Sequence, residues 1–94
     1  MILSYKDART ARFAGGERVK QFEPFRARAE RVLDRLDMAL NLGDVANFPG
    51  HRLERLKGDR KGQWSVRIND QWRICFSWSD SAAGPSDVEI VDYH

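Results

Sequence analysis

The sequence predicts an α+β domain in which N-terminal helices pack on one face of a small, mostly antiparallel sheet. Two patterns predict this arrangement. In the first half, apolar residues recur every three or four positions, as in an amphipathic helix. In the second half, two segments joined by a short polar loop alternate between apolar and polar residues, as in half-buried strands. With 94 residues, the chain is expected to form a single domain, residues 1–94, with one modest core.

The N-terminal half is expected to hold a short strand and two helices. The sequence ILSY predicts the strand, and DARTARFAGG predicts about two turns of helix that begin near Asp7 and end at the two glycines. A longer helix is predicted from Pro24, because proline is tolerated in a first helical turn, and Gly43 is expected to end it. Its apolar stripe, which we expect in the core, is Phe25, Ala29, Val32, Leu33, Leu36, Ala39 and Leu40.

The second half is expected to contain four strands joined by short turns. Pro49 and Gly50 mark the first turn, GDRKG the second and SAAGPS a loop before the last strand. The first of these strands, RLERLK, should place Leu53 on the face opposite its charged neighbours.

The register of the two central strands follows from the need to bury one face throughout. Pairing Trp64 with Phe76, Val66 with Ile74 and Ile68 with Trp72 meets this requirement. The same register sets two arginines opposite each other on the other face, Arg67 and Arg73.

Opposed like charges destabilise a sheet unless something neutralises them. Carboxylates could do so, with Glu89 on the last strand and Asp59 in a turn as candidates. Alternatively, the face could be preset for a phosphate group, which guanidinium groups bind bidentately. The sequence leaves both interpretations open.

Positive charge is concentrated in residues 51–73. This segment has seven basic and three acidic residues, a net charge of +4, so the remainder carries −2 of the total of +2. Such a segment either is a solvated basic face or binds an anionic partner, most often a nucleic acid. The candidate RNA contacts in it are Lys57, Arg67, Arg52, Arg60 and Lys61.

Several other classes of protein are disfavoured. No apolar stretch approaches the roughly 20 residues of a membrane span, and the N-terminal apolar run is too short for a signal peptide, so we expect a cytoplasmic location and no membrane partner.

Cys75 is the single cysteine, which gives neither a disulfide framework nor metal-ligand spacing, and we expect no metal and no cofactor. His51 lies in a turn, where a lone histidine is more often an exposed surface residue than a ligand.

The end of the chain offers groups for cleaving an RNA phosphodiester. That reaction needs a base for the 2′-OH, an acid for the leaving 5′-oxygen, and cations for the charged transition state. His94 could be the acid or the base, because imidazole titrates near neutral pH. Tyr93 could orient the phosphate and Asp92 could hold a neighbour, although strand alternation directs these two side chains to opposite faces. Arg73 would supply positive charge.

The second half of the chain, from about residue 49 to residue 94, resembles HigB-type toxins of bacterial toxin–antitoxin modules, within the RelE/ParE superfamily. The matching segments are LKGDRKGQWS, NDQWRICF and the terminal DYH. The resemblance implies a RelE-like fold and a metal-independent endoribonuclease that cuts mRNA in the A site of the 70S ribosome. It also implies a HigA-like helix-turn-helix antitoxin as partner, through which operator DNA is bound. The catalytic set implied by position is Asp92, Tyr93, His94 and Arg73, with Lys57 and Arg67 as contacts to RNA.

One position departs from the family pattern. Some members carry a histidine that contributes to cleavage where this sequence has Glu54. Either Glu54 acts as the base, or His94 does so with Glu54 as a helper. A carboxylate surrounded by cations is a weak base, which predicts slow cleavage. Two alternatives stay open: a ParE-like inhibitor of DNA gyrase, and a ribosome- or RNA-binding module that has lost catalysis.

Overall fold

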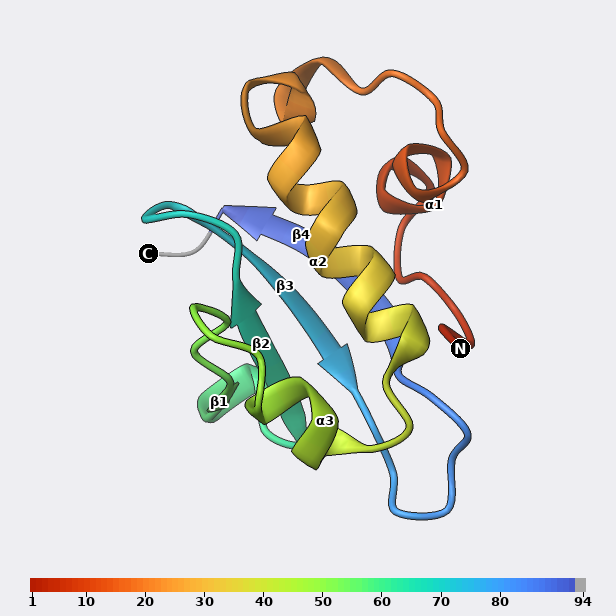
Figure 1. Cartoon of the computed structure of the whole chain (residues 1–94), viewed down its shortest axis with the longest axis vertical. Helices are drawn as coiled ribbons and strands as arrows, with labels where there is room; N and C mark the ends of the chain where they lie inside the picture. Colours follow the sequence, from red (N-terminus) through yellow and green to blue (C-terminus); the bar gives the residue numbers. More distant parts are fainter. Residues whose placement is uncertain (93–94) are drawn as a thin grey trace.

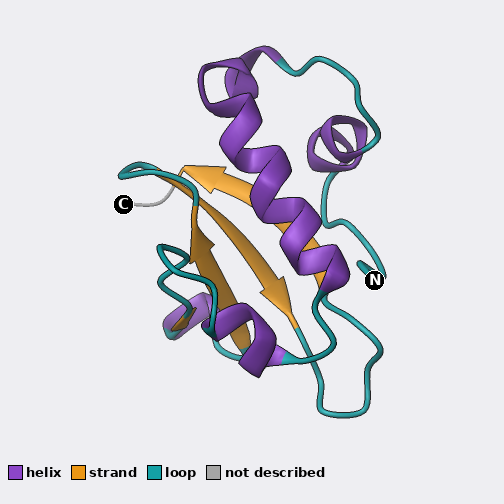
Figure 2. Cartoon of the chain, in the orientation of Figure 1, coloured by secondary structure: helices purple, strands orange, loops and turns teal. Residues whose placement is uncertain are grey.

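A computed structural model describes residues 1–92 and confirms the α+β arrangement of helices on one face of an antiparallel sheet (Figures 1 and 2). Within these residues the sheet has four strands in the order β1-β2-β3-β4. No helix of the described chain is long and apolar enough to cross a membrane. The elements are α1 (Ala8–Ala14), η1 (Lys20–Phe25), α2 (Arg26–Met38), α3 (Leu42–Ala46), β1 (Glu54–Arg55), η2 (Gly58–Arg60), β2 (Gln63–Arg67), β3 (Trp72–Ser77) and β4 (Ser86–Asp92), where η denotes a 3-10 helix.

The short first helix, α1, is confirmed with its expected ends. The Asp7 side chain accepts a hydrogen bond from the Thr10 amide at 2.7 Å and so satisfies one free amide of the first turn. At the other end the Gly15 amide donates to the Ala11 carbonyl at 3.0 Å. Phe13 faces the core and is buried.

The strand expected at ILSY is not formed. The segment makes a single parallel bridge, between Tyr5 and Val88, on the outer edge of β4. Flanking hydrogen bonds join the Leu3 amide to the Pro85 carbonyl at 2.8 Å and the Val88 amide to the Ser4 carbonyl at 3.1 Å. The ladder stops there because Asp7 already caps α1, which leaves no room for a longer extended segment.

The long helix expected from Pro24 to Gly43 is divided into three parts, so the end predicted at Gly43 is wrong. Pro24 lies inside the 3-10 turn η1, α2 ends at Met38, and Gly43 is in the first turn of the separate helix α3. The break has a local cause. Asn41 caps α3 by accepting from the Asp44 amide at 3.0 Å, and the Asp44 carboxylate accepts from the Leu40 amide at 2.8 Å.

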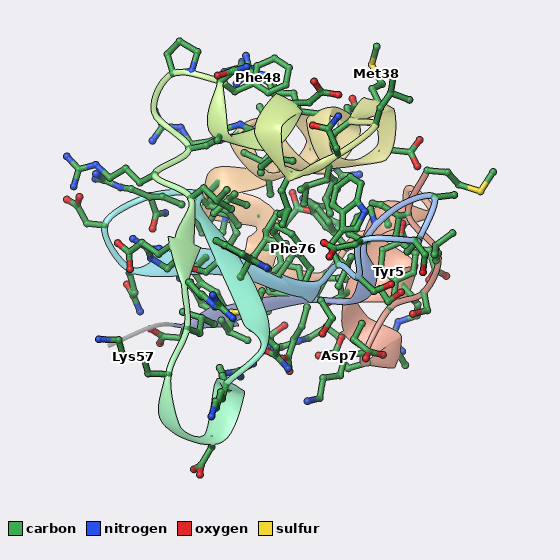
Figure 3. All side chains as sticks on the ribbon, turned by 90° about the horizontal axis from the view of Figure 1, so that it is seen from below. Tyr5, Asp7, Met38, Phe48, Lys57 and Phe76 are labelled. Atoms are coloured by element: carbon green, nitrogen blue, oxygen red, sulfur yellow. The ribbon has the colours of Figure 1, made fainter. Side chains whose placement is uncertain are left out.

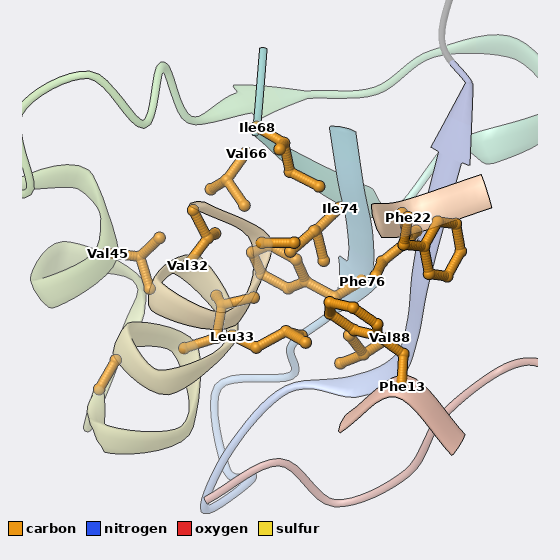
Figure 4. Packing of buried hydrophobic residues seen from close by; sticks show 14 of the residues in the cluster. Phe13, Phe22, Val32, Leu33, Val45, Val66, Ile68, Ile74, Phe76 and Val88 are labelled. Atoms are coloured by element: carbon orange, nitrogen blue, oxygen red, sulfur yellow. The ribbon is translucent and has the colours of Figure 1, made fainter. Parts of the chain in front are cut away.

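The core lies between α2 and the sheet, as the apolar stripe predicted (Figure 4). Leu40 is the exception in that stripe, because it lies beyond the end of α2 and is 80% exposed. The buried residues of α2 are Ala29, Val32, Leu33 and Leu36, and those on the strands or next to them include Val66, Ile68, Ile74, Phe76, Val88 and Ile90.

The register predicted for the central hairpin is confirmed. Trp64 pairs with Phe76 and Val66 with Ile74. The hairpin closes through a 2.9 Å hydrogen bond from the Ile68 amide to the Trp72 carbonyl.

The strand expected around Leu53 is shorter than predicted. It is reduced to Glu54–Arg55, because Arg52 has φ 49°, in the left-handed region, and the chain enters η2 soon after Leu56. Leu53 is partly buried against the core and Glu54 is exposed, as the alternation predicted.

The outer edge of β4 is tied to α1 by a buried side chain. The Ile90 amide donates to the Thr10 hydroxyl at 3.1 Å, and Thr10 is fully buried. A hydroxyl therefore completes a backbone bond that a further strand would otherwise make.

We predict that Thr10→Val lowers the free energy of unfolding by about 1–3 kcal/mol, because it leaves the Ile90 amide buried without an acceptor. Urea titration followed by circular dichroism measures the change. Thr10→Ser keeps the hydroxyl and should cost less than the valine variant. A valine variant as stable as the serine variant would contradict the role given to this hydrogen bond.

Candidate functional site

The open face of the sheet, turned away from α2, carries two rows of polar residues. In one row Glu54 lies opposite Ser65, Ser65 opposite Cys75, and Cys75 opposite Glu89. In the other row Arg67 lies opposite Arg73, and Arg73 opposite Val91. Alternation along the strands places both rows on the same face.

Arg73 is the anchored cation of this face. Its Nη1 donates to the Ser65 hydroxyl at 2.7 Å, and its Nη2 donates to Glu54 Oε1 at 3.2 Å. Only 13% of the arginine side chain is exposed. The guanidinium group is thus held in one orientation by partners on β2 and β1, which is the kind of fixed cation that stabilises a developing negative charge.

Arg67 and Arg73 lie opposite each other as predicted, but their side chains turn to different partners. Arg73 turns toward Glu54, whereas Arg67 pairs with Asp70 in the β2–β3 turn. The carboxylates are not those the sequence suggested. Glu89 binds Arg60 at 3.1 Å instead, and Asp59 lies in η2, where the structure records no ion pair for it within residues 1–92.

The remaining basic candidates lie along the chain from β1 into η2. Lys57 is exposed, and its side chain projects outward beyond β1 (Figure 3). Arg60 lies over the open face, where it donates to both Gln63 and Glu89 at 3.1 Å. Arg52 and Lys61 are exposed.

Of the three C-terminal residues in the expected catalytic set, Asp92 is the one that the structure describes. It lies opposite Trp72 in the β3–β4 ladder, and its Oδ2 accepts from Gln71 Nε2 at 3.0 Å. Alternation places it on the face opposite that of Arg73. Tyr93 and His94 lie outside the described residues.

Cys75 lies in the row between Ser65 and Glu89, and its side chain is buried. Burial raises the pKa of the Cys75 thiol, which disfavours the thiolate that a nucleophile requires. Within residues 1–92, no group of three His, Cys, Asp or Glu side chains is placed to hold a metal ion.

Comparison with known proteins assigns the family. The profile of HigB-like toxins, described as the RelE-like toxin of the type II toxin–antitoxin system HigB, matches residues 3–94. The chain belongs to this family.

Two curated relatives agree with the HigB-like assignment. The chain is 43% identical over 53 residues to Toxin HigB-1 of Vibrio cholerae, a match that covers 56% of each protein. It is 38% identical over 68 residues to Endoribonuclease HigB of Proteus vulgaris, a match that covers 69% of this chain and 71% of the relative. The first match therefore spans little more than half the length of the Vibrio protein.

A solved structure supports the fold of this HigB-like chain. The YoeB–YefM complex from Staphylococcus aureus contains a chain that is similar over 100% of this chain and 98% of its own, with a TM-score of 0.60 and 17% sequence identity. At this identity the likeness concerns the fold alone.

The sequence predicts that His51 is an exposed surface residue, and this prediction is wrong because the residue is buried. Its side chain lies against Phe48, with 5.3 Å between the ring centroids, and only 3% of the residue is exposed. Nε2 is 3.3 Å from Arg35 Nη1. Since arginine can only donate, the imidazole must be neutral with its proton on Nδ1. The contact depends on α2, so the turn sequence alone gave no sign of it.

Burial lowers the pKa of His51, the charge of Arg35 lowers it further, and the Val45 carbonyl partly offsets both effects. As the pH falls below about 6.5, the unfolded chain takes up a proton at this histidine, while the folded chain takes it up only at a lower pH. The unfolded state then binds more protons, so stability is lost as the pH decreases.

We predict that the free energy of unfolding falls between pH 7.5 and pH 5.5, with a His51 contribution of at most about 1.4 kcal/mol per pH unit. Urea titrations at several pH values measure it. His51→Gln keeps an acceptor for Arg35 but cannot titrate, so its stability should vary less over this range. An equal pH dependence in both proteins would exclude His51 as the source.

Proposed function

We propose that this chain is a ribosome-dependent endoribonuclease that cleaves mRNA in the A site and thereby inhibits translation and growth. The observation that supports this most directly is Arg73, a cation fixed by Glu54 and Ser65 on the open face of a HigB-like fold. The relative named Endoribonuclease HigB supports the same activity.

The proposed reaction requires no metal. A base takes the proton of the 2′-OH, the 2′-oxygen attacks the adjacent phosphorus, and an acid returns a proton to the 5′-oxygen as its bond to phosphorus breaks. Arg73 stabilises the charge that develops on the phosphate, and Lys57 and Arg67 bind neighbouring parts of the RNA. His94 is the acid or the base, with Asp92 and Tyr93 as its neighbours in the catalytic set.

For Glu54 the ion pair favours a positioning role. Glu54 Oε1 accepts a hydrogen bond from Arg73 Nη2 at 3.2 Å, so this oxygen is already engaged in the ion pair. The same contact fixes the guanidinium group on which the phosphate would lie. We therefore assign proton transfer to His94 and alignment of Arg73 to Glu54.

The proposed partners are a HigA-like helix-turn-helix antitoxin, the 70S ribosome and mRNA. Operator DNA would be bound only through the antitoxin. The family description names a type II toxin–antitoxin system, which supports the antitoxin.

Glu54 variants test the division of roles. Glu54→Gln keeps an oxygen acceptor for Arg73 but cannot act as a base, so we expect cleavage on programmed ribosomes to fall by about tenfold or less. Glu54→Ala removes the acceptor as well and should lose more. If glutamine costs the roughly 10²–10⁴-fold typical of a lost general base, Glu54 is the base and the positioning role is wrong.

Arg73 and His94 variants test the nuclease itself. We expect Arg73→Ala to lower the rate of cleavage by about 10²–10³-fold, and His94→Ala by about 10²–10⁴-fold. Mapping of mRNA ends on ribosomes measures both, with growth arrest scored in parallel. Growth arrest that persists in His94→Ala without any mRNA cleavage would instead support a gyrase inhibitor or a binding module.

A further inference from the structure

Helix α2 carries opposite charges on its two flanks. Three arginines recur at spacings of three and four and so form one stripe beside the apolar face, and three acidic residues form another stripe on the far side. The acidic flank borders a hollow next to the N-terminal segment, lined also by Ile2 and Tyr5. The basic stripe is Arg28, Arg31 and Arg35, and the acidic stripe is Glu30, Asp34 and Asp37.

The basic stripe forms one wall of a pocket of about 390 Å³. Arg67 at the end of β2 and His51 complete the set of polar residues around it. No Asp or Glu is among the described residues that line this pocket. Like charges three and four residues apart disfavour a helix, so the spacing of these three arginines does not itself stabilise α2.

Arg67 of this pocket pairs with Asp70, whereas two arginines of the basic stripe are held by uncharged groups. Arg28 Nη1 donates to the Ile68 carbonyl at 3.1 Å. Arg35 lies over the Phe48 ring, 4.8 Å from its centroid, and its Nη1 is 3.3 Å from the neutral His51 imidazole. Arg31 is exposed and makes no ion pair within residues 1–92. These contacts orient the guanidinium groups of Arg28 and Arg35 without neutralising them.

We propose that this pocket binds a phosphate group of an RNA backbone, as a second contact outside the open face. Arg67 supports RNA over a small free anion, because it lies opposite Arg73 in the sheet and also lines the pocket. An RNA strand that reaches Arg73 on the open face can therefore continue past Arg67 to the arginines of α2. The choice of RNA as the ligand rests on the proposed function.

Arg31→Gln tests this site with little effect on the fold, because Arg31 is exposed. The probe is a labelled 2′-O-methyl RNA 12-mer, which lacks the attacking 2′-OH and cannot be cleaved. Binding to the full chain is followed by fluorescence anisotropy at several salt concentrations. We expect up to about fivefold weaker binding, as for the loss of one exposed ionic contact. The slope of log affinity against log salt should shrink by about 0.7.

Two matched variants control for charge. Arg12→Gln, on α1 and outside the pocket, changes the net charge equally and should leave the slope unchanged. Arg31→Lys keeps the charge and should also retain the slope. If Arg31→Gln and Arg12→Gln have equal effects, or neither has any, the pocket is not an RNA site.

Binding of other probes shows which kind of RNA supplies the phosphate group. Stronger Arg31 dependence with the single strand indicates mRNA, and stronger dependence with an RNA hairpin of the same 2′-O-methyl chemistry indicates a ribosomal RNA stem. Arg31-dependent binding of a polyglutamate peptide, with no Arg31 dependence for either RNA, would overturn the proposal in favour of an acidic protein segment. Because the probe cannot be cleaved, a failed ribosome assay with intact Arg31-dependent binding would refute only the nuclease.

Discussion

The pairing of β2 with β3 is the constraint on which the rest of the structure depends. Its register places Val66 opposite Ile74 and Trp64 opposite Phe76, so a single apolar face is presented to α2. A shift of one residue would exchange the two faces and direct Arg67 and Arg73 into the core. The buried face thus fixes, by alternation alone, which arginines reach the open face.

The arginines differ in whether a carboxylate holds them. Arg73 is held by Glu54 and Ser65 and is largely buried, so its geometry is defined before any ligand arrives. In the basic stripe of α2, Arg28 is held by a carbonyl and Arg35 by an aromatic ring and a neutral imidazole, so the charge of these two arginines stays available. The first kind suits stabilisation of a reacting phosphate, and the second suits attraction of a polyanion.

The sequence predicts those parts of the molecule that local patterns specify. The hairpin register and the ends of α1 could be predicted, because period-two alternation, an Asp cap and a glycine are local signals. The division of the long helix could not, because Leu40 extends the apolar stripe although Asn41 and Asp44 cap a new helix there. Asn41 and Asp44 form a capping motif, and this motif was the local signal in the sequence for the start of a new helix.

In the candidate site, too, features set by local patterns could be predicted, whereas features set by contacts between distant segments could not. The opposition of Arg67 and Arg73 was predictable, but the Glu54–Arg73 ion pair was not, because it depends on the pairing of a two-residue strand with β2. The burial of His51 depends on a meeting with α2 that no spacing in the turn reveals. The spacing of the three arginines in the basic stripe of α2 can be read from the sequence, but the residues that face them across the pocket cannot.

The N-terminal segment is held by residues near the other end of the sequence, because residues 3–10 bond to Pro85, Val88 and Ile90. During synthesis these partners are made long after the N-terminal segment, so that segment can take its place in the fold only once β4 has been made.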